Sequence, residues 1–229
     1  MKITVIIPAL NEVGCIGDLV QETLSQSVDE IIVVDNGSTD GTAGAAQQAN
    51  AQVVCEPRRG YGYACAAGVV AATDADVIVF LDGDYSSLPS EMLLLLAPLI
   101  ENRADLVLGS RTLGEIAPGA MPPHQRFGNW LAARLMRMLY GLRVTDLGPY
   151  RAIKTDLLRA LDMREMTYGW PTEMMVKAAR QHARILEVPV SYHPRRAGRS
   201  KVSGTLRGTV LAAYYILGVT LRYSKISSS

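Results

Sequence analysis

Short apolar runs alternate with stretches of helical character through the first half of the chain, and this alternation strongly limits its fold. The apolar runs are rich in Val, Ile and Leu and are predicted to be strands buried on both faces, at 3–8, 30–35, 52–55, 77–81 and 105–109. The stretches between them, 12–25, 42–49, 61–73 and 89–101, are predicted helices. The pattern indicates an α/β fold with a mostly parallel sheet and helices on both faces.

The second half of the chain is less regular. We expect a Pro- and Gly-containing loop at 112–123, an amphipathic helix at 124–140, a turn at 146–150 and a helix around 172–181. Short strands near 184–192, a basic loop at 194–204 and an apolar helix at about 205–223 complete the pattern. A length of 229 residues suits one domain over 1–229. Its expected parts are a nucleotide-binding half (1–111), an acceptor half (112–204) and a C-terminal helix and tail (205–229).

The charge is unevenly distributed. Seven basic residues and no acidic residue follow Glu187, while the whole chain has a net charge of +1, so the part up to Glu187 carries −6. A basic tail on an acidic body points to phosphate or an anionic surface, although simple solubility would also account for it. No nucleic-acid-binding motif accompanies the charge, so nucleic acid is not an expected partner. Three cysteines without CxxC spacing favour reduced thiols in a cytoplasmic protein.

Polar residues follow four of the predicted strands. They occur at 8–12, 35–41, 82–84 and 109–111. Because ligands of open α/β sheets bind beyond the carboxyl ends of the strands, these four segments predict one site at one edge of the sheet.

Asp82-Gly83-Asp84 directly follows a buried apolar run. Two carboxylates one residue apart can hold Mg²⁺ or Mn²⁺ with positions left for a diphosphate, whose departure such a cation would assist. The alternative is a β-turn, which the same residues favour. Asp35 in the 35–41 segment can accept from a nucleobase N–H, whereas helix capping by Asp40 is the alternative reading of that segment.

In order, these motifs resemble family 2 glycosyltransferases, and within them the dolichol- or polyprenyl-phosphate hexosyltransferases. The resemblance is carried by Pro8-x-x-Asn11-Glu12, Asp35-x-Gly37-Ser38-x-Asp40, Arg59-Gly60, Asp82-x-Asp84, Gly109-Ser110-Arg111, Asp146-Leu-Gly-Pro-Tyr150-Arg151, Glu173 and Arg196-x-x-Gly198-x-Ser200-Lys201. It implies a glycosyltransferase A-type fold with a Rossmann-like nucleotide-binding half. It also implies inverting transfer of a hexose (mannose or glucose) from a metal-bound GDP- or UDP-sugar to a polyprenyl or dolichyl phosphate.

The resemblance also assigns roles to individual residues. The nucleotide-sugar would contact Pro8, Asn11, Glu12, Asp35, Gly37, Arg59, Gly60, Asp82 and Gly83. Asp82 and Asp84 would hold the metal, Arg111, Arg126 and Asn129 the acceptor phosphate, and Asp84, Asp146, Arg151 and Lys201 would serve in catalysis. Three positions depart from the family pattern: Asn36, Ser86 and the Leu-Gly-Pro-Tyr before Arg151.

The acceptor decides whether a base is needed. A phosphate acceptor is already ionised, whereas a hydroxyl acceptor requires a general base, for which Asp146 and Glu173 are the candidates. The alternative role of Glu173 is to stabilise the first turn of its helix. Two further readings stay open at this point: the same transfer to a soluble acceptor, and a non-catalytic nucleotide-sugar binder or nucleotidyltransferase.

Membrane contact would have to be peripheral. The apolar stretch 208–221 has 14 residues, and a span needs about 20. It is either a buried helix or an interfacial one at the inner membrane face. The helix at 124–140, with Arg126, Arg134 and Arg137 beside Trp130, is a second candidate surface, which a homodimer contact would use equally well.

Overall fold

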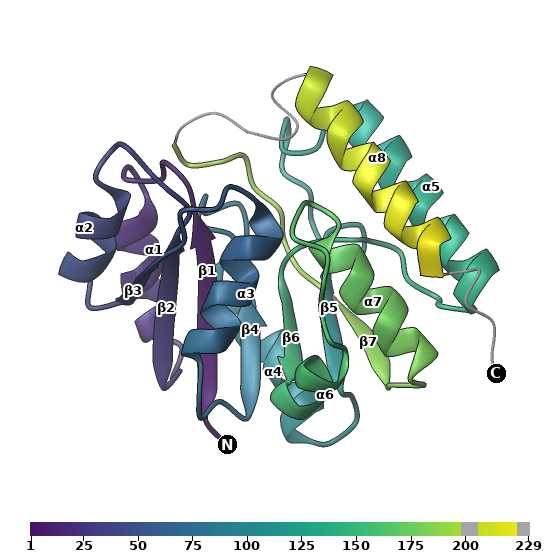
Figure 1. Cartoon of the computed structure of the whole chain (residues 1–229), viewed down its shortest axis with the longest axis horizontal. Helices are drawn as coiled ribbons and strands as arrows, with labels where there is room; N and C mark the ends of the chain where they lie inside the picture. The colour runs from purple at the N-terminus through teal and green to yellow at the C-terminus, as the bar shows by residue number, and fades with distance from the viewer. Residues whose placement is uncertain (198–205, 224–229) are drawn as a thin grey trace.

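The computed structural model describes residues 1–197 and 206–223. Within them, seven strands form one sheet in the order β3-β2-β1-β4-β6-β5-β7 (Figure 1). The strands are β1 (Ile3–Ala9), β2 (Glu30–Asp35), β3 (Gln52–Cys55), β4 (Val77–Phe80), β5 (Leu106–Ser110), β6 (Arg151–Lys154) and β7 (Ile185–Pro189). All neighbours pair in parallel except β6, which is antiparallel to both β4 and β5. The predicted α/β class with a mostly parallel sheet is confirmed.

Helices cover both faces of this sheet (Figure 1). They are α1 (Ile16–Leu24), α2 (Thr42–Gln48), α3 (Tyr61–Ala71), α4 (Met92–Ile100), α5 (Pro123–Tyr140), α6 (Thr155–Ala160), α7 (Trp170–Arg180) and α8 (Leu206–Arg222), with a 3₁₀ turn, η1, at Pro89–Glu91. Successive side chains of a strand point to opposite faces. Accordingly, Val5 and Ile7 of β1 pack in one core with α1 and α4, while Ile6 packs in the other with α3 and α7.

Several predicted elements differ from the observed ones. The predicted strand at 52–55 is not buried on both faces, because β3 lies at the edge of the sheet and its four residues are partly or fully exposed. Residues 12–15 form a turn, so α1 begins only at Ile16. The predicted helix at 89–101 is divided into η1 and α4. β6 and α6, which follow the predicted turn at 146–150, were not predicted from the sequence.

The register brings the ends of the parallel strands level with one another. Ala9 at the end of β1 lies opposite Asp35 of β2, and Asp35 lies opposite Cys55 of β3. The segments that follow these strands therefore meet at one edge, the upper edge in Figure 1. None of the helices within the described residues is long and apolar enough to cross a bilayer.

Candidate active site

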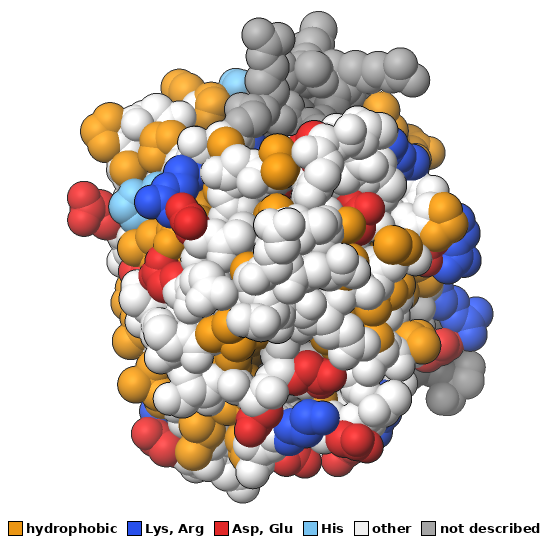
Figure 2. All heavy atoms as spheres, turned by 90° about the vertical axis from the view of Figure 1, so that its left-hand side faces the viewer, with side chains coloured by type: hydrophobic (Ala, Val, Ile, Leu, Met, Phe, Trp, Pro, Cys, Tyr) orange, Lys and Arg blue, Asp and Glu red, His pale blue; other side chains and the backbone are white. Residues whose placement is uncertain are grey.

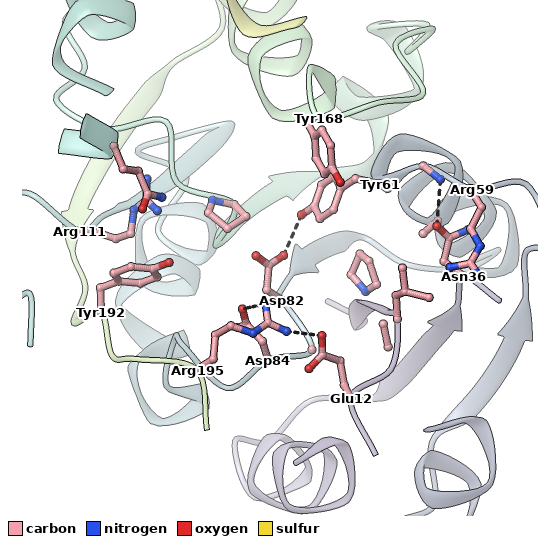
Figure 3. Close-up of a pocket in the computed structure, with 18 residues that line it drawn as sticks. Glu12, Asn36, Arg59, Tyr61, Asp82, Asp84, Arg111, Tyr168, Tyr192 and Arg195 are labelled. Carbon is pink, nitrogen blue, oxygen red and sulfur yellow. Dashed lines mark hydrogen bonds and ion pairs between the residues drawn. The ribbon is translucent and has the colours of Figure 1, made fainter. Parts of the chain in front are cut away.

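A cavity of about 350 Å³ opens at this edge of the sheet. Figure 3 shows side chains from the ends of β1, β2 and β4 pointing into it together with residues from α3 and the segment after β7. The start of α5 also contributes to the lining. Its lining consists of Pro8, Ala9, Leu10, Glu12, Asn36, Arg59, Gly60, Tyr61, Ala64, Asp82, Gly83, Asp84, Arg111, Gln125, Pro149, Tyr168, Tyr192 and Arg195. The predicted meeting of polar segments at one edge therefore corresponds to a cavity in the structure.

Asp82 and Asp84 lie at the centre of the cavity, where β4 ends (Figure 3). The Tyr61 hydroxyl donates to Asp82 Oδ1 at 3.1 Å. Burial, and secondly the charge of Asp84, raise the pKa of Asp82 to about 7. Asp84 Oδ1 accepts hydrogen bonds from the backbone N–H of Ser86 at 3.0 Å and from its hydroxyl at 2.6 Å. Two carboxylates so close together repel each other, and a cation between them would relieve that repulsion.

Arg195, in the segment after β7, already supplies one such cation. Its Nη1 lies 2.8 Å from Asp84 Oδ2, and its Nη2 pairs with Glu12 Oε1 (Figure 3). The backbone N–H of Arg196 also donates to the carbonyl of Asp84 at 3.2 Å. Arg195 thus joins the ends of β1 and β4, although it is 111 residues from Asp84 in the sequence. From the sequence, Arg195 was predicted only as part of a basic loop, with no role in the site.

Arg111 lines the same cavity and is held by Asp146. Two parallel hydrogen bonds, Nε to Oδ2 and Nη2 to Oδ1, are each 2.7 Å long, and the backbone N–H of Arg111 donates to Oδ2 at 2.7 Å. Both side chains are at least nine-tenths buried. Burial works to lower the pKa of Arg111, but the Asp146 carboxylate outweighs it, so the pKa lies above its ordinary value. The guanidinium also lies over the ring of Tyr192, 4.9 Å from its centroid.

The β2 end of the cavity is formed by Asn36, one of the residues that departs from the family pattern. Its Nδ2 donates to the carbonyls of Glu56 at 3.0 Å and Arg58 at 2.7 Å, and its Oδ1 accepts from the N–H of Gly60 at 3.0 Å. A carboxylate could not donate to those two carbonyls. The amide at this position therefore fixes the loop that carries Arg59 and Gly60 against the end of β2 (Figure 3).

Three predicted nucleotide contacts lie outside the cavity lining. Asn11 Oδ1 accepts from the N–H of Thr39 at 2.9 Å, and its own N–H donates to the Ser38 hydroxyl at 2.9 Å. Asp35 Oδ1 accepts from the N–H of Ser38 at 3.0 Å. Gly37 has a φ of 80°, which a residue with a Cβ rarely adopts. Together, Asn11, Asp35 and Gly37 shape the loop beside the site.

Two of the predicted catalytic residues, Asp146 and Arg151, also lie outside the lining. Arg151 is buried, and its guanidinium donates to the carbonyls of Gly148, Pro149 and Pro171, the last at 2.8 Å. Burial lowers the pKa of Arg151 to about 10. Its contacts hold the 148–149 turn against the start of α7. Lys201, a further predicted catalytic residue, lies outside the described residues.

The candidate base Glu173 is fully buried in the fold rather than exposed to the cavity. Its carboxylate accepts from the N–H groups of Arg164 at 2.9 Å and Glu165 at 2.7 Å, and from the Tyr223 hydroxyl at 2.6 Å. It also pairs with Lys177 at 2.9 Å. These contacts tie α7 to the segment before it and to the end of α8.

At the start of α5, the residue that lines the cavity is Gln125 and not Arg126. Arg126 is exposed. Gln125 Oε1 is buried and has no hydrogen-bond partner within the described residues, so it is an acceptor available to a ligand. Asn129, one turn later, accepts from the N–H of Leu147 at 2.9 Å and donates to the carbonyl of Thr145 at 3.2 Å, holding the segment beside Asp146.

Six lining residues with polar side chains were not assigned a role from the sequence: Asn36, Tyr61, Gln125, Tyr168, Tyr192 and Arg195. The sequence did hold a signal for Tyr61, because it is the first residue of the predicted helix that directly follows Arg59-Gly60. The tyrosines of the second half and Arg195 had no comparable signal, because long loops bring them to the cavity.

No group of three His, Cys, Asp or Glu side chains is arranged to hold a metal within the described ranges. Asp82 and Asp84 nevertheless suit a hard divalent cation, because they provide oxygen ligands. Burial first, and then the charge of Asp84, raise the pKa of Asp82, and a bound cation would favour its ionised form. Such an ion would take its remaining ligands from phosphate oxygens or water.

Comparisons with known proteins agree with this arrangement. The sequence model described as "Glycosyl transferase family 2" matches residues 4–162. An uncharacterized glycosyltransferase of Mycobacterium tuberculosis is 38% identical over 216 residues, which cover 92% of this chain and 94% of the relative. The undecaprenyl-phosphate mannosyltransferase of Micrococcus luteus is 32% identical over 242 residues, with coverage of 97% and 96%.

Among solved structures, a similar one is glucosyl-3-phosphoglycerate synthase from Mycobacterium tuberculosis in complex with Mn²⁺, UDP and glucosyl-3-phosphoglycerate. Its TM-score is 0.79 at 25% sequence identity, and the match covers 100% of this chain and 81% of that one. This likeness confirms the predicted glycosyltransferase A-type fold. With a family model matching well over half of its length, the chain belongs to glycosyl transferase family 2.

Proposed function

We propose that the protein transfers a hexose, with inversion, from a nucleoside diphosphate sugar to a polyprenyl phosphate. The observation that carries this proposal is that the pair Asp82 and Asp84 shares one cavity with two arginines, Arg195 and Arg111. Two arginines beside the carboxylates suit two anions: the diphosphate of the donor and the phosphate of the acceptor.

On the donor side, Asp82 and Asp84 would hold Mg²⁺ or Mn²⁺. That ion would offset the charge that develops on the departing nucleoside diphosphate. Arg195 is close enough to Asp84 to reach the same diphosphate, and the 36–60 region would enclose the nucleoside. Mn²⁺ and UDP accompany the structural neighbour, which supports a cation and a nucleotide in this position.

On the acceptor side, Arg111 would orient the phosphate for attack on the anomeric carbon from the face opposite the diphosphate. Asp146 fixes the plane of the guanidinium by its two parallel hydrogen bonds, so Arg111 is held in place before substrate arrives. A phosphate oxygen is already ionised near pH 7 and attacks without a general base.

A hydroxyl of a soluble acceptor is the second candidate, and the neighbour with glucosyl-3-phosphoglycerate favours it. It would require a base. Of the two candidates from the sequence, Asp146 is bound on both oxygens by Arg111, and Glu173 lies outside the cavity lining. That distribution of carboxylates supports a phosphate acceptor, and so does the polyprenyl-phosphate acceptor in the name of the relative from Micrococcus luteus.

The test is release of nucleoside diphosphate from a panel of UDP- and GDP-linked glucose and mannose with Mn²⁺, with and without a short polyprenyl phosphate in detergent. We expect release to depend on the lipid phosphate and to fall at least about 100-fold in Asp84→Asn. Asp162→Asn, in an exposed ion pair, is the matched control and should retain activity. Release that needs phosphoglycerate and ignores the lipid phosphate would replace the first candidate with the second.

A further inference from the structure

A row of large apolar side chains is exposed along α5. Phe127, Trp130 and Met138 are 63%, 55% and 71% exposed, and the rings of Phe127 and Trp130 lie 5.8 Å apart. On α8, Tyr214 and Leu221 are 71% and 51% exposed. Single exposed apolar residues are ordinary, but a group of aromatic and aliphatic side chains on adjacent helices marks a contact surface.

These exposed side chains are not the core-facing residues of the two helices, because each helix packs against the protein with a different face. Ala132, Ala133 and Met136 of α5 are buried. On α8, Val219 and Thr220 are buried, and the carbonyl of Thr220 accepts from the hydroxyl of Tyr140 at the end of α5. The two helices lie side by side at the upper right in Figure 1. We call their outward surface, defined by Phe127, Trp130, Met138, Tyr214 and Leu221, the α5–α8 face.

The charged residues of these two helices have one sign. Neither α5 nor α8 contains an Asp or Glu, and α5 carries exposed Arg126, Arg134 and Arg137. Arg134 follows Trp130 by four residues and so lies next to it on the helix surface. The side of the molecule toward α1 and α2 is different, because acidic and basic side chains both occur there (Figure 2). Aromatic residues flanked by arginines without acidic neighbours suit the boundary between anionic headgroups and acyl chains.

A second copy of the chain fits this charge less well. In a symmetric dimer the same surface faces itself, so the arginines of α5 would approach those of the other copy without acidic partners on either helix. An anionic lipid surface would instead attract each of them.

The first turn of α5 lies at the cavity. Gln125 in this turn lines the cavity, whereas Phe127, two residues further along, points to another side of the helix and is exposed. The same helix therefore borders the cavity with its first turn and carries part of the α5–α8 face.

We infer that the α5–α8 face docks on a membrane surface that contains anionic lipids, with Phe127 and Trp130 entering the headgroup region and the arginines of α5 at the phosphates. The inference rests on the proposed function in one respect, since it explains how the chain reaches a lipid-linked acceptor. The docking itself requires no transfer and is measured separately.

The experiment is co-sedimentation of the full chain with vesicles of phosphatidylcholine, with and without one third phosphatidylglycerol and without any polyprenyl phosphate. We expect binding to the anionic vesicles that weakens with salt. The partition coefficient should fall at least about tenfold in Phe127→Ser/Trp130→Ser. It should fall about fivefold or more for each charge reversed in Arg134→Glu/Arg137→Glu. Val70→Ser/Leu93→Ser, which changes residues 78% and 66% exposed on α3 and α4, is the matched control and should bind like the wild type.

A second readout locates the contact. Phosphatidylcholine brominated on its acyl chains should quench the fluorescence of Trp130, and the quenching should be lost in Trp130→Phe because Trp170 is only 3% exposed. An equal loss of vesicle binding in the control variant, or no quenching of Trp130 fluorescence, would overturn the inference. The inference would also be overturned if the wild-type protein did not bind the vesicles but formed a dimer, and if the Phe127→Ser/Trp130→Ser variant were monomeric. Transfer to detergent-dispersed polyprenyl phosphate should survive in Phe127→Ser/Trp130→Ser, so failure of the docking and failure of the proposed function give different results.

Discussion

Individual ion pairs of the protein differ greatly in burial, and the difference determines what each contributes. Arg111 and Asp146 are 9% and 1% exposed in their side chains, whereas Arg164 and Asp162 are 75% and 69% exposed. In water the two members of an exposed pair are well solvated when apart, so their pairing adds little. Removing one member of a buried pair leaves a charge that neither water nor protein compensates.

We therefore expect Asp146→Ala to lower the free energy of unfolding by about 3–5 kcal/mol. Asp162→Ala should lower it by less than about 1 kcal/mol. Urea denaturation of both variants and of the wild type measures the difference. Similar losses in the two variants would mean that the Arg111 guanidinium finds another partner or reaches solvent, and that Asp146 is not what holds it in the cavity.

At the scale of elements, α3 approaches the sheet closely because it carries glycine where a side chain would collide. A Cβ at Gly68 would lie 2.4 Å from Ile6 Cγ2 of β1, and one at Gly62 would lie 2.3 Å from the carbonyl oxygen of Glu165. Both distances are too short for real atoms. The close approach brings Tyr61, at the start of α3, within hydrogen-bonding distance of Asp82.

Gly68→Ala should accordingly destabilise the protein by about 1–3 kcal/mol, although alanine favours helices. Gly44→Ala is the matched control in α2, where a new Cβ meets no atom within 4 Å. It should stabilise the protein by about 0.5–1 kcal/mol. Thermal or urea unfolding provides the comparison, and stabilisation by both substitutions would contradict the close packing of α3 on β1.

Asp105 joins β5, β6 and β7 at the strand ends that lie away from the cavity. Its carboxylate accepts from the N–H of Arg184 at 3.0 Å and from the guanidinium Nε at 2.9 Å and Nη2 at 2.7 Å, and it pairs with Lys154 at 3.0 Å. The Arg184 side chain, opposed only in part by burial, holds the pKa of Asp105 well below its ordinary value. The carboxylate is therefore more stable in the folded chain than in the unfolded one.

A folded-state pKa below the unfolded value of about 4 has a defined consequence. The stabilisation is complete above about pH 4 and is lost as the pH falls toward the lower, folded-state pKa. Asp105→Asn should thus be less stable than the wild type at pH 7, and the difference in their free energies of unfolding should become smaller below about pH 4. Urea unfolding of both proteins between pH 7 and pH 3 measures this difference. A difference that stays constant across that range would show that the ion pairs of Asp105 do not account for its contribution to stability.

At the scale of the whole molecule, the cavity is lined by residues from Pro8 near one end of the chain to Arg195 near the other. A ligand that fills it binds the folded chain and not the unfolded one, so binding adds to stability by mass action. At a nucleotide concentration of about 100 Kd the gain is about 2.7 kcal/mol.

For a chain of this size, that gain corresponds to a rise in Tm of about 5–11 °C. We expect the rise with Mn²⁺ and either UDP or GDP, and the nucleotide that produces it identifies the donor base. Asp84→Asn should abolish the shift and Asp162→Asn should keep it, in differential scanning calorimetry with and without each ligand. A shift of equal size in Asp84→Asn would place the nucleotide away from the two aspartates.

The sequence predicted most elements of the first half well because their signals are local. Runs of Val, Ile and Leu separated by helical stretches specify the parallel strands, and a turn motif after each strand specifies what lies at the sheet edge. The strand β6 was missed because Arg151–Lys154 is a four-residue segment between a turn and a helix, with a charged residue at each end. Its place between β4 and β5 depends on pairing with strands that are distant in sequence.

The amino-acid sequence alone determined the fold class, the family and the position of Asp82 and Asp84 at the end of a buried strand, because these follow from patterns within a few residues. Only the tertiary structure decided which charges meet. It turned Gln125 and not Arg126 toward the cavity, locked Asp146 to Arg111, and brought Arg195 to Asp84 and Glu12. Such pairings depend on helix rotation and on the packing of distant segments, and residue spacing along the chain does not encode either of them locally.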